Sequence, residues 1–387
     1  MKMSIIEPSQ PTAHARGTEA MAICVAGLLL GCSVSALIAL TAFNLLSDGV
    51  GLPLVGLSFF AYALGLWLPG PLNAYLVECF YRKRLFYGAT VVLVASGMAS
   101  GLTESLPGVF LLRLVQGGAA GVALLALGTL VNDLSVSSLR TRADAALSWF
   151  RRVALPLGLG GGWWLTDVVG SHGLTYVWAL MPAICAMAVV AFVRVSFKAP
   201  LHQRRFSLDR FWLSQAWPLT LNMFPVAVVA GMVIASESSP IYYMYMAGGC
   251  LFGMWCEHVV LVNADERAQL STGLLLTAAG VLLCTQENGT AVTLSMFLLG
   301  AGLSQTVARF LLYYLKLPGH CQRATAQHTY LLVLDTGLAV GYWAGCSGLP
   351  FTVGSLLLVA FSLALYLGLT HKWFVKHRDR GFRFREI

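Results

Sequence analysis

The sequence is dominated by long runs of apolar residues that carry almost no charge. Residues 20–46, for example, include no Asp, Glu, Lys or Arg. A helix that crosses a bilayer core about 30 Å thick needs about 20 predominantly apolar residues. Only 11% of the 387 residues are charged, against roughly 25% in soluble domains, and the alternation typical of a membrane β-barrel is missing. The sequence therefore predicts an all-α, polytopic membrane protein.

Turn-forming residues divide the apolar sequence into twelve predicted transmembrane helices. Breaks such as Ser105-Leu106-Pro107-Gly108 and Ser238-Ser239-Pro240 combine Gly, Pro and Ser, which favour turns over helix. The connections are short, so we expect sequential helices to pack antiparallel. The predicted helices span residues 19–46, 52–79, 85–103, 108–134, 143–168, 174–195, 212–235, 240–262, 268–285, 291–316, 327–346 and 350–371.

The basic residues alternate between connections in a way that predicts the orientation. With both termini in the cytoplasm, the two tails and five connections on that side hold 21 Lys and Arg, and the six opposite connections hold none. Those six carry acids instead: Asp48, Glu104, Glu237 and Glu287. This distribution follows the positive-inside rule. It predicts a multi-pass protein with both ends cytoplasmic, and the lack of long extramembrane domains favours a bacterial inner membrane.

The longest polar connection lies midway along the chain. Residues 196–211 form a predicted cytoplasmic linker between two six-helix bundles, residues 19–195 and 212–371, with cytoplasmic tails at 1–18 and 372–387. The net charge of +8 is concentrated in tails and connections, where it suits an anionic lipid surface rather than nucleic acid. Two bundles in one chain provide a complete transport path, which predicts function as a monomer.

Several charged or polar residues fall inside predicted helices. A charge near the bilayer centre costs roughly 2.5–3.5 kcal/mol even on the lenient insertion scale, so such residues face a partner or water. We interpret them as lining a central cavity or coupling protons to transport. The alternative is that they lie near helix ends and form static pairs between helices, chiefly for the two consecutive arginines of the fifth helix. The candidates are Arg113, Gln116, Arg151, Arg152, Glu257, Arg309 and Asp335.

The sequence shows no pattern for a metal, a cofactor or a catalytic centre. The nine cysteines have no CxxC spacing, and the eight histidines are scattered, whereas metal sites and acid–base sites need clustered ligands. An intramembrane lipid-modifying enzyme therefore remains a minor alternative, and so does a channel or receptor, since no filter-like sequence is present.

Three short motifs lie in the first half. Residues 74–84 read AYLVECFYRKR between the second and third predicted helices, Arg113–Gly117 reads RLVQG in the fourth, and residues 155–161 read LPLGLGG in the fifth. They resemble the G-x-L-x-D-R-x-G-R-K, R-x-x-Q-G and G-P-x-x-G-G motifs of the major facilitator superfamily. The second matches fully. The first lacks both glycines and the first Arg, and the third begins with Leu155 and is shifted by one position.

The resemblance implies two six-helix bundles around a central cavity, and a role in proton coupling for Arg113. It also implies a cytoplasmic gate network, for which the matching residues are Glu78, Arg82, Lys83 and Asp133. No cofactor is implied.

The sequence as a whole predicts a secondary active transporter that works by alternating access, with protons and a small molecule as its partners. Asp335 and Glu257 are the predicted proton carriers, and Arg113 and Arg309 would tune them or bind substrate. The motif in the fifth helix favours proton-coupled efflux of a small organic compound. The excess of arginines over deep acids favours the alternative, which is proton-coupled uptake of an anionic or zwitterionic metabolite.

Overall fold

The computed structural model describes residues 13–136, 139–169, 172–194, 204–261, 263–286, 288–318 and 322–378. Of the predicted tails and linker, residues 1–12, 196–203 and 379–387 therefore lie outside the described residues. The part of the chain that is described folds into helices and their connections, without a strand.

Each of the twelve predicted ranges contains a long helix, with ends that differ by a few residues. The long helices are α1 (Ala13–Ser47), α2 (Leu52–Trp67), α4 (Arg82–Ser100), α5 (Leu106–Leu134), α6 (Arg140–Val169), α7 (His172–Phe192), α8 (Trp217–Ser236), α9 (Pro240–Val259), α10 (Glu266–Leu283), α11 (Gly289–Lys316), α12 (Arg323–Cys346) and α13 (Phe351–Leu365). Short elements accompany them: η1 (Gly70–Leu72), α3 (Asn73–Cys79), η2 (Ser214–Ala216), the π-helical turn η4 (Tyr366–Thr370) and α14 (His371–Arg378).

The range predicted as one helix over residues 52–79 is divided. It contains α2, the turn η1 and α3, because the sequence Pro69-Gly70-Pro71 removes two backbone donors and adds a flexible glycine. Proline is instead favourable within the first turn of a helix, where its missing N–H has no helical partner to lose. Pro53, Pro107 and Pro218 occupy that position in α2, α5 and α8.

Seven helical segments of the described residues are long and apolar enough to cross a membrane. They are residues 17–47, 52–79, 106–134, 173–192, 214–236, 289–316 and 351–377. The predicted spans outside this set include α6, where Arg151 and Arg152 interrupt the apolar sequence. Large apolar side chains such as Leu357 and Phe361 are exposed on α13, as on a helix that faces lipid. The chain is therefore a multi-pass helical membrane protein.

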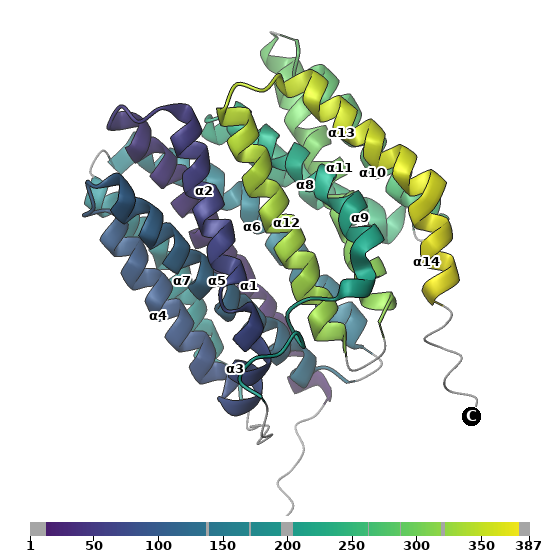
Figure 1. Cartoon of the computed structure of the whole chain (residues 1–387), viewed down its shortest axis with the longest axis horizontal. Helices are drawn as coiled ribbons and strands as arrows, with labels where there is room; N and C mark the ends of the chain where they lie inside the picture. Colours follow the sequence, from purple (N-terminus) through teal and green to yellow (C-terminus); the bar gives the residue numbers. More distant parts are fainter. Residues whose placement is uncertain are drawn as a thin grey trace, which may run out of the picture.

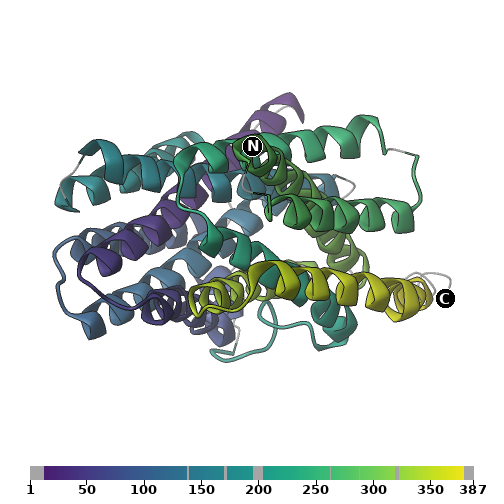
Figure 2. The same cartoon turned by 90° about the horizontal axis from the view of Figure 1, so that it is seen from above.

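The helices form two sets that meet along the middle of the molecule. We call α1–α7 the first set and α8–α14 the second set; in Figure 1 they lie mainly to the left and to the right. Within the first set α1 packs on α6 and α7, and α5 on α2 and α4; within the second, α8 packs on α12 and α11 on α9 and α10. The sets touch where α2 meets α12 and where α6 meets α9 and α11. Figure 2 shows α13 and α14 along one face of the second set.

Small residues bring paired helices into close contact. A Cβ on Gly117 of α5 would collide with the carbonyl oxygen of Tyr62 on α2, and one on Gly341 of α12 would collide with the carbonyl oxygen of Val228 on α8. Helices in a membrane associate through such close packing, because lipid provides no hydrophobic driving force between them. The glycine of the R-x-x-Q-G motif therefore has a packing role here.

The two ends of the bundle differ in charge. We call the end that carries Arg82, Arg140, Arg210, Arg267 and Arg323 the basic end; it is the lower end in Figure 1, near α3 and α14. The opposite end carries the α1–α2, α4–α5, α8–α9 and α12–α13 connections.

Candidate functional site

A cavity of about 130 Å³ lies between the two sets of helices. Side chains of α1, α2, α5 and α6 line it from the first set, and side chains of α8, α9, α11 and α12 line it from the second. An apolar cavity of roughly 150 Å³ holds one benzene molecule, so the space in this structure accommodates a molecule of that size. Because both sets contribute to the wall, any movement of one set against the other changes the cavity.

Most of the wall is apolar, with a few polar groups among these side chains. Phe59, Leu303 and Leu334 are among the apolar residues, and Ser35 and Ser148 contribute hydroxyl groups. A largely apolar wall with a small number of placed polar groups is the usual character of a small-molecule site.

Arg151 and Asp335 form an ion pair across this cavity. Arg151 belongs to α6 in the first set and Asp335 to α12 in the second; Nη2 and Oδ2 are 3.7 Å apart, which exceeds hydrogen-bond distance. Both side chains line the cavity and keep 18% and 16% of their surface exposed. The pair is therefore a loose contact that is open to a molecule in the cavity.

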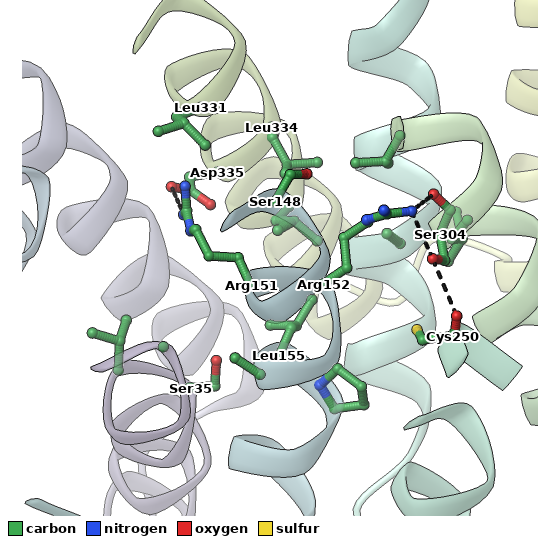
Figure 3. A pocket seen from close by; sticks show the side chains of 18 of the residues that line it. Ser35, Ser148, Arg151, Arg152, Leu155, Cys250, Ser304, Leu331, Leu334 and Asp335 are labelled. Atoms are coloured by element: carbon green, nitrogen blue, oxygen red, sulfur yellow. Dashed lines mark hydrogen bonds and ion pairs between the residues drawn. The ribbon is translucent and has the colours of Figure 1, made fainter. Parts of the chain in front are cut away.

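Arg152 leaves α6 on another side and is held more firmly (Figure 3). Its Nη1 donates to the carbonyl oxygen of Ser304 at 2.6 Å and to the Ser304 hydroxyl at 2.9 Å, and it lies 3.4 Å from Oε1 of Glu257. The side chains of Arg152 and Glu257 are only 6% and 7% exposed. Successive residues of a helix point about 100° apart, so α6 binds α12 through one arginine and α9 and α11 through the next.

Both arginines keep donors that have no hydrogen-bond acceptor among the described residues. These are Nη1 of Arg151 and Nε and Nη2 of Arg152. A buried donor without a partner costs about 1–3 kcal/mol, and more when it is charged.

The other predicted site residues lie outside the lining of the cavity. Arg113 is buried on α5; its Nη1 donates to Oε1 of Gln116 at 2.9 Å, and its guanidinium lies 5.2 Å from the ring centre of Tyr62. Gln116 donates in turn to Ser100 of α4 at 2.8 Å. Tyr62, which contacts Arg113 and also lines the cavity, connects this group to it.

Glu257 and Arg309 belong to the second set and lie near Arg152 rather than in the lining. Glu257 approaches the cavity only through its contact with Arg152. Arg309 lies close enough to Glu257 to interact with its charge, and its Nε has no acceptor among the described residues. The structure therefore brings Arg151, Arg152, Glu257 and Asp335 together and keeps Arg113 and Gln116 apart from them.

The predicted gate residues lie at the basic end and form two ion pairs. Arg82 at the start of α4 pairs with Asp133 near the end of α5, as the motif implies. Glu78 of α3 pairs with Arg210, which precedes α8. Lys83 lies elsewhere: its Nζ donates to the carbonyl oxygens of Ala191 and Val193 at the end of α7. The Lys83 interaction stabilises the end of a helix within the first set.

Arg210 joins the two sets and was missed by the sequence analysis. Its φ of 56° is the one positive value of a non-glycine residue in the described part of the chain, a conformation that costs about 1–3 kcal/mol. Its N–H donates to Thr325 of α12 at 2.8 Å, and its carbonyl oxygen accepts from Asn73 of α3 at 3.3 Å. Glu78 therefore reaches the start of α12 through Arg210.

Other contacts join the two sets near both ends of the bundle. At the basic end Nδ2 of Asn73 lies 2.9 Å from Nε2 of His328 on α12. Towards the opposite end, the rings of Phe59 on α2 and Tyr342 on α12 are 5.7 Å apart, and Gly160 of α6 packs against α9. The glycine-rich stretch of α6 thus contributes to this packing. The sequence analysis did not single out Asn73 and His328, because these two residues contact each other from positions that are far apart along the chain.

Comparisons with known proteins support the fold. No protein-family model matches the chain, and no curated protein matches it. Among solved structures, a mutant form of the nucleoside transporter NupG superposes with a TM-score of 0.65 at 12% identity, covering 91% of this chain and 99% of that one. A D-xylose-proton symporter superposes with a TM-score of 0.67 at 14% identity, covering 90% and 96%.

Both of these proteins are described as transporters. The similarity extends over nearly the whole of each chain, so this chain shares the fold of these two transporters. At 12–14% identity the solved structures say nothing about the substrate, because fold does not determine function.

Proposed function

We propose that this protein is a secondary active transporter of the major facilitator superfamily, which moves a small organic solute together with protons by alternating access. The observation that carries the proposal is the cavity between the two sets, with the ion pair of Arg151 and Asp335 across it. A charged pair inside a membrane is costly and marks a substrate or ion path. Neither set binds the solute alone, so their relative movement opens the site to one side or the other.

The proposed topology follows the sequence. The twelve long helices each cross the membrane, in two bundles of six over residues 19–195 and 212–371, and the basic end faces the cytoplasm with both termini. The positive-inside rule supports this orientation. We place the protein in the inner membrane of a bacterium, acting as a monomer.

Uptake is the proposed direction. One neighbour is described as a proton symporter, and the comparisons give no support to the efflux that the motif in the fifth helix favoured. The stretch over residues 155–161 contributes Leu155 and Pro156 to the cavity wall and Gly160 to the contact with α9.

Arg151, Arg152 and Asp335 are the proposed binding and coupling residues. The residues that line the cavity include two arginines with donors that lack acceptors among the described residues, and one carboxylate, which suits an anionic or zwitterionic solute of small size. Asp335 is the proposed proton carrier, since it is the acid that lines the cavity. Glu257 is proposed to hold Arg152 in place.

The ion pairs at the basic end are the proposed cytoplasmic gate. Glu78 and Arg210 connect α3, the linker and α12, while Arg82 and Asp133 fix α4 to α5. Breaking the first pair would free the two bundles at this end, and the second would keep the first bundle rigid.

Transport is tested in liposomes that enclose a pH-sensitive dye. Purified protein is reconstituted, pools of small organic acids, amino acids, sugars and nucleosides are added outside, and proton entry is recorded. The wild type is compared with Asp335→Asn and with the matched control Asp167→Asn, whose exposed side chain lies on α6. We expect solute-dependent proton entry in the wild type and the control and none in Asp335→Asn. Silence of the wild type across all pools, or an unaffected Asp335→Asn, would refute the proposal.

A further inference from the structure

The two consecutive arginines of α6 differ in how firmly they are held. Arg152 has two hydrogen bonds to Ser304 and a buried carboxylate beside it, whereas Arg151 has one ion pair at 3.7 Å. Arg151 and Asp335 are also the more exposed pair within the cavity. Of the two guanidinium groups, that of Arg151 is therefore the one whose ion-pair partner a molecule in the cavity could replace.

The charge of the cavity limits what is able to replace that partner. The two ion pairs at the cavity join Arg151 to Asp335 and Arg152 to Glu257, so the charges balance within these pairs. In a buried site an uncompensated charge costs several kcal/mol. A monoanion that takes the place of Asp335 at Arg151 leaves the Asp335 carboxylate without a partner, unless that carboxylate binds a proton.

We propose that the substrate is a monocarboxylate with a small apolar body, and that its carboxylate replaces Asp335 at Arg151 while Asp335 takes up one proton. This inference rests on the proposed transport function and defines its substrate class and coupling. The proton comes from water on the side of entry and leaves with the substrate on the other side. Each cycle then moves one monoanion with one proton, and no net charge crosses the membrane.

The groups around Asp335 agree with a carboxyl group that alternates between two forms. Arg151 of α6 faces it, and Tyr62 of α2 and Tyr330 of α12 lie close enough to interact with its charge. Arg113 of α5 lies beyond Tyr62, and His328 of α12 interacts with the charge of Arg151. The neighbouring α8 carries no Asp, Glu, Lys, Arg or His. Among the described residues, Arg151 is thus the one cation that forms an ion pair with Asp335.

The remaining wall specifies the rest of the molecule. Phe59, Leu303 and Leu334 provide apolar surface, and the volume of about 130 Å³ is near that which holds one aromatic ring. Neutral molecules have no charge to replace the Asp335 carboxylate. Cations would be repelled by the two arginines.

The proposal is tested by calorimetry on the full-length protein in detergent. Benzoate, phenylacetate and hexanoate are titrated at pH 8 in two buffers of different ionisation enthalpy, with benzamide and benzylamine as the neutral and cationic counterparts. The difference between buffers gives the number of protons taken up on binding. We expect uptake of one proton per bound acid, no binding of the amide or the amine, and affinity that weakens about tenfold per pH unit while Asp335 of the empty site is ionised.

Two variants separate the roles of the pair. Asp335→Asn resembles the protonated carboxyl, so it should bind the same acids with no proton uptake and no dependence on pH, and Arg151→Gln should not bind them. Binding of an acid without proton uptake by the wild type, binding by Arg151→Gln, or binding of none of the three acids would overturn the proposal. The liposome assay tests the transport function separately. If the protein moves protons with a sugar but binds none of these acids, the proposed transport function stands and the proposed substrate class is wrong.

Discussion

Arg152 offers the sharpest test of which contacts hold the two sets of helices together. The substitution Arg152→Met keeps an unbranched side chain of similar length and removes the guanidinium. It deletes the hydrogen bonds to the carbonyl oxygen and hydroxyl of Ser304, at 2.6 and 2.9 Å, and leaves Glu257 without its ion-pair partner at 3.4 Å. The side chain of Glu257 is only 7% exposed, so water would compensate little for the loss of its ion-pair partner.

The expected loss of stability follows from that burial. Removing one partner of a buried ion pair costs about 3–5 kcal/mol, because the remaining charge loses its direct partner. Arg309 interacts with the charge of Glu257 but forms no ion pair with it among the described residues, so it does not replace Arg152. The double variant Arg152→Met with Glu257→Gln removes both charges and should regain most of that loss. The pair of Lys316 and Glu266 is a matched control: it is 2.9 Å long but 45% and 24% exposed, and Lys316→Met should cost less than about 1 kcal/mol.

The measurement is equilibrium unfolding in mixed micelles, followed by circular dichroism, for the wild type, the two single variants at the buried pair, their double variant and Lys316→Met. A double variant as unstable as Arg152→Met would refute the reasoning, since the cost would then come from lost packing or from Ser304 rather than from an unpaired carboxylate. So would a loss in Lys316→Met as large as in Arg152→Met.

Three further predictions concern packing and the basic end. Gly117→Val should prevent accumulation of folded protein, judged by gel filtration in detergent, because its side chain would collide with the backbone of α2. Gly118→Ala is the control, since a Cβ at Gly118 has its nearest neighbour at an ordinary 3.5 Å. Equal yields of the two variants would contradict this prediction. Arg210→Gly keeps the left-handed backbone and loses the pair with Glu78. Trypsin should therefore cleave after Arg204 and Arg205 several-fold faster than in the wild type, and an unchanged rate would count against a gate role for this pair. Lys83→Ala should change the free energy of unfolding by less than about 1 kcal/mol, and a larger loss in the same micelle titration would show that Lys83 belongs to the gate network after all.

The helices were predictable from the sequence because a membrane constrains each one locally. Length, apolar content and turn residues such as those before Pro107 and Pro240 determine where a helix begins, without reference to its neighbours. The division of residues 52–79 into α2, η1 and α3 was visible in Pro69 and Pro71 but was outweighed by the apolar character of the range. Hydropathy alone does not recover every helix, since α6 combines its apolar residues with Arg151 and Arg152.

The composition of the candidate site was only partly predictable, because pairing depends on contacts between distant helices. The sequence marked Arg151, Arg152 and Asp335 as charges in unfavourable places, and the structure places all three on one cavity. It did not indicate that Arg113 is held by Gln116 away from that cavity. A five-residue motif identifies a helix turn but contains no information on which neighbouring helix that turn faces.

Arg210 illustrates the limit most clearly. Its position in a polar linker suggests a solvated charge, yet its backbone is held in the left-handed region by Thr325 and Asn73 while its side chain binds Glu78. Each of these partners lies more than 100 residues away. Local propensity disfavours this conformation by about 1–3 kcal/mol, so only the assembled basic end stabilises it.

The contrast between the two arginines of α6 links this architecture to coupling. If both were bound as firmly as Arg152, the sets would be fixed together and the cavity would have no replaceable charge. If both were as loosely bound as Arg151, α6 would have no fixed contact with α9 and α11 through which to transmit movement. A firm contact beside a loose one on adjacent residues lets α6 keep its place against α9 and α11 while its contact with α12 depends on what occupies the cavity. In the proposed mechanism solute and proton act on the interface between α6 and α12. The proposed gate pair of Glu78 and Arg210, which reaches the start of α12, is then the element that their binding must release.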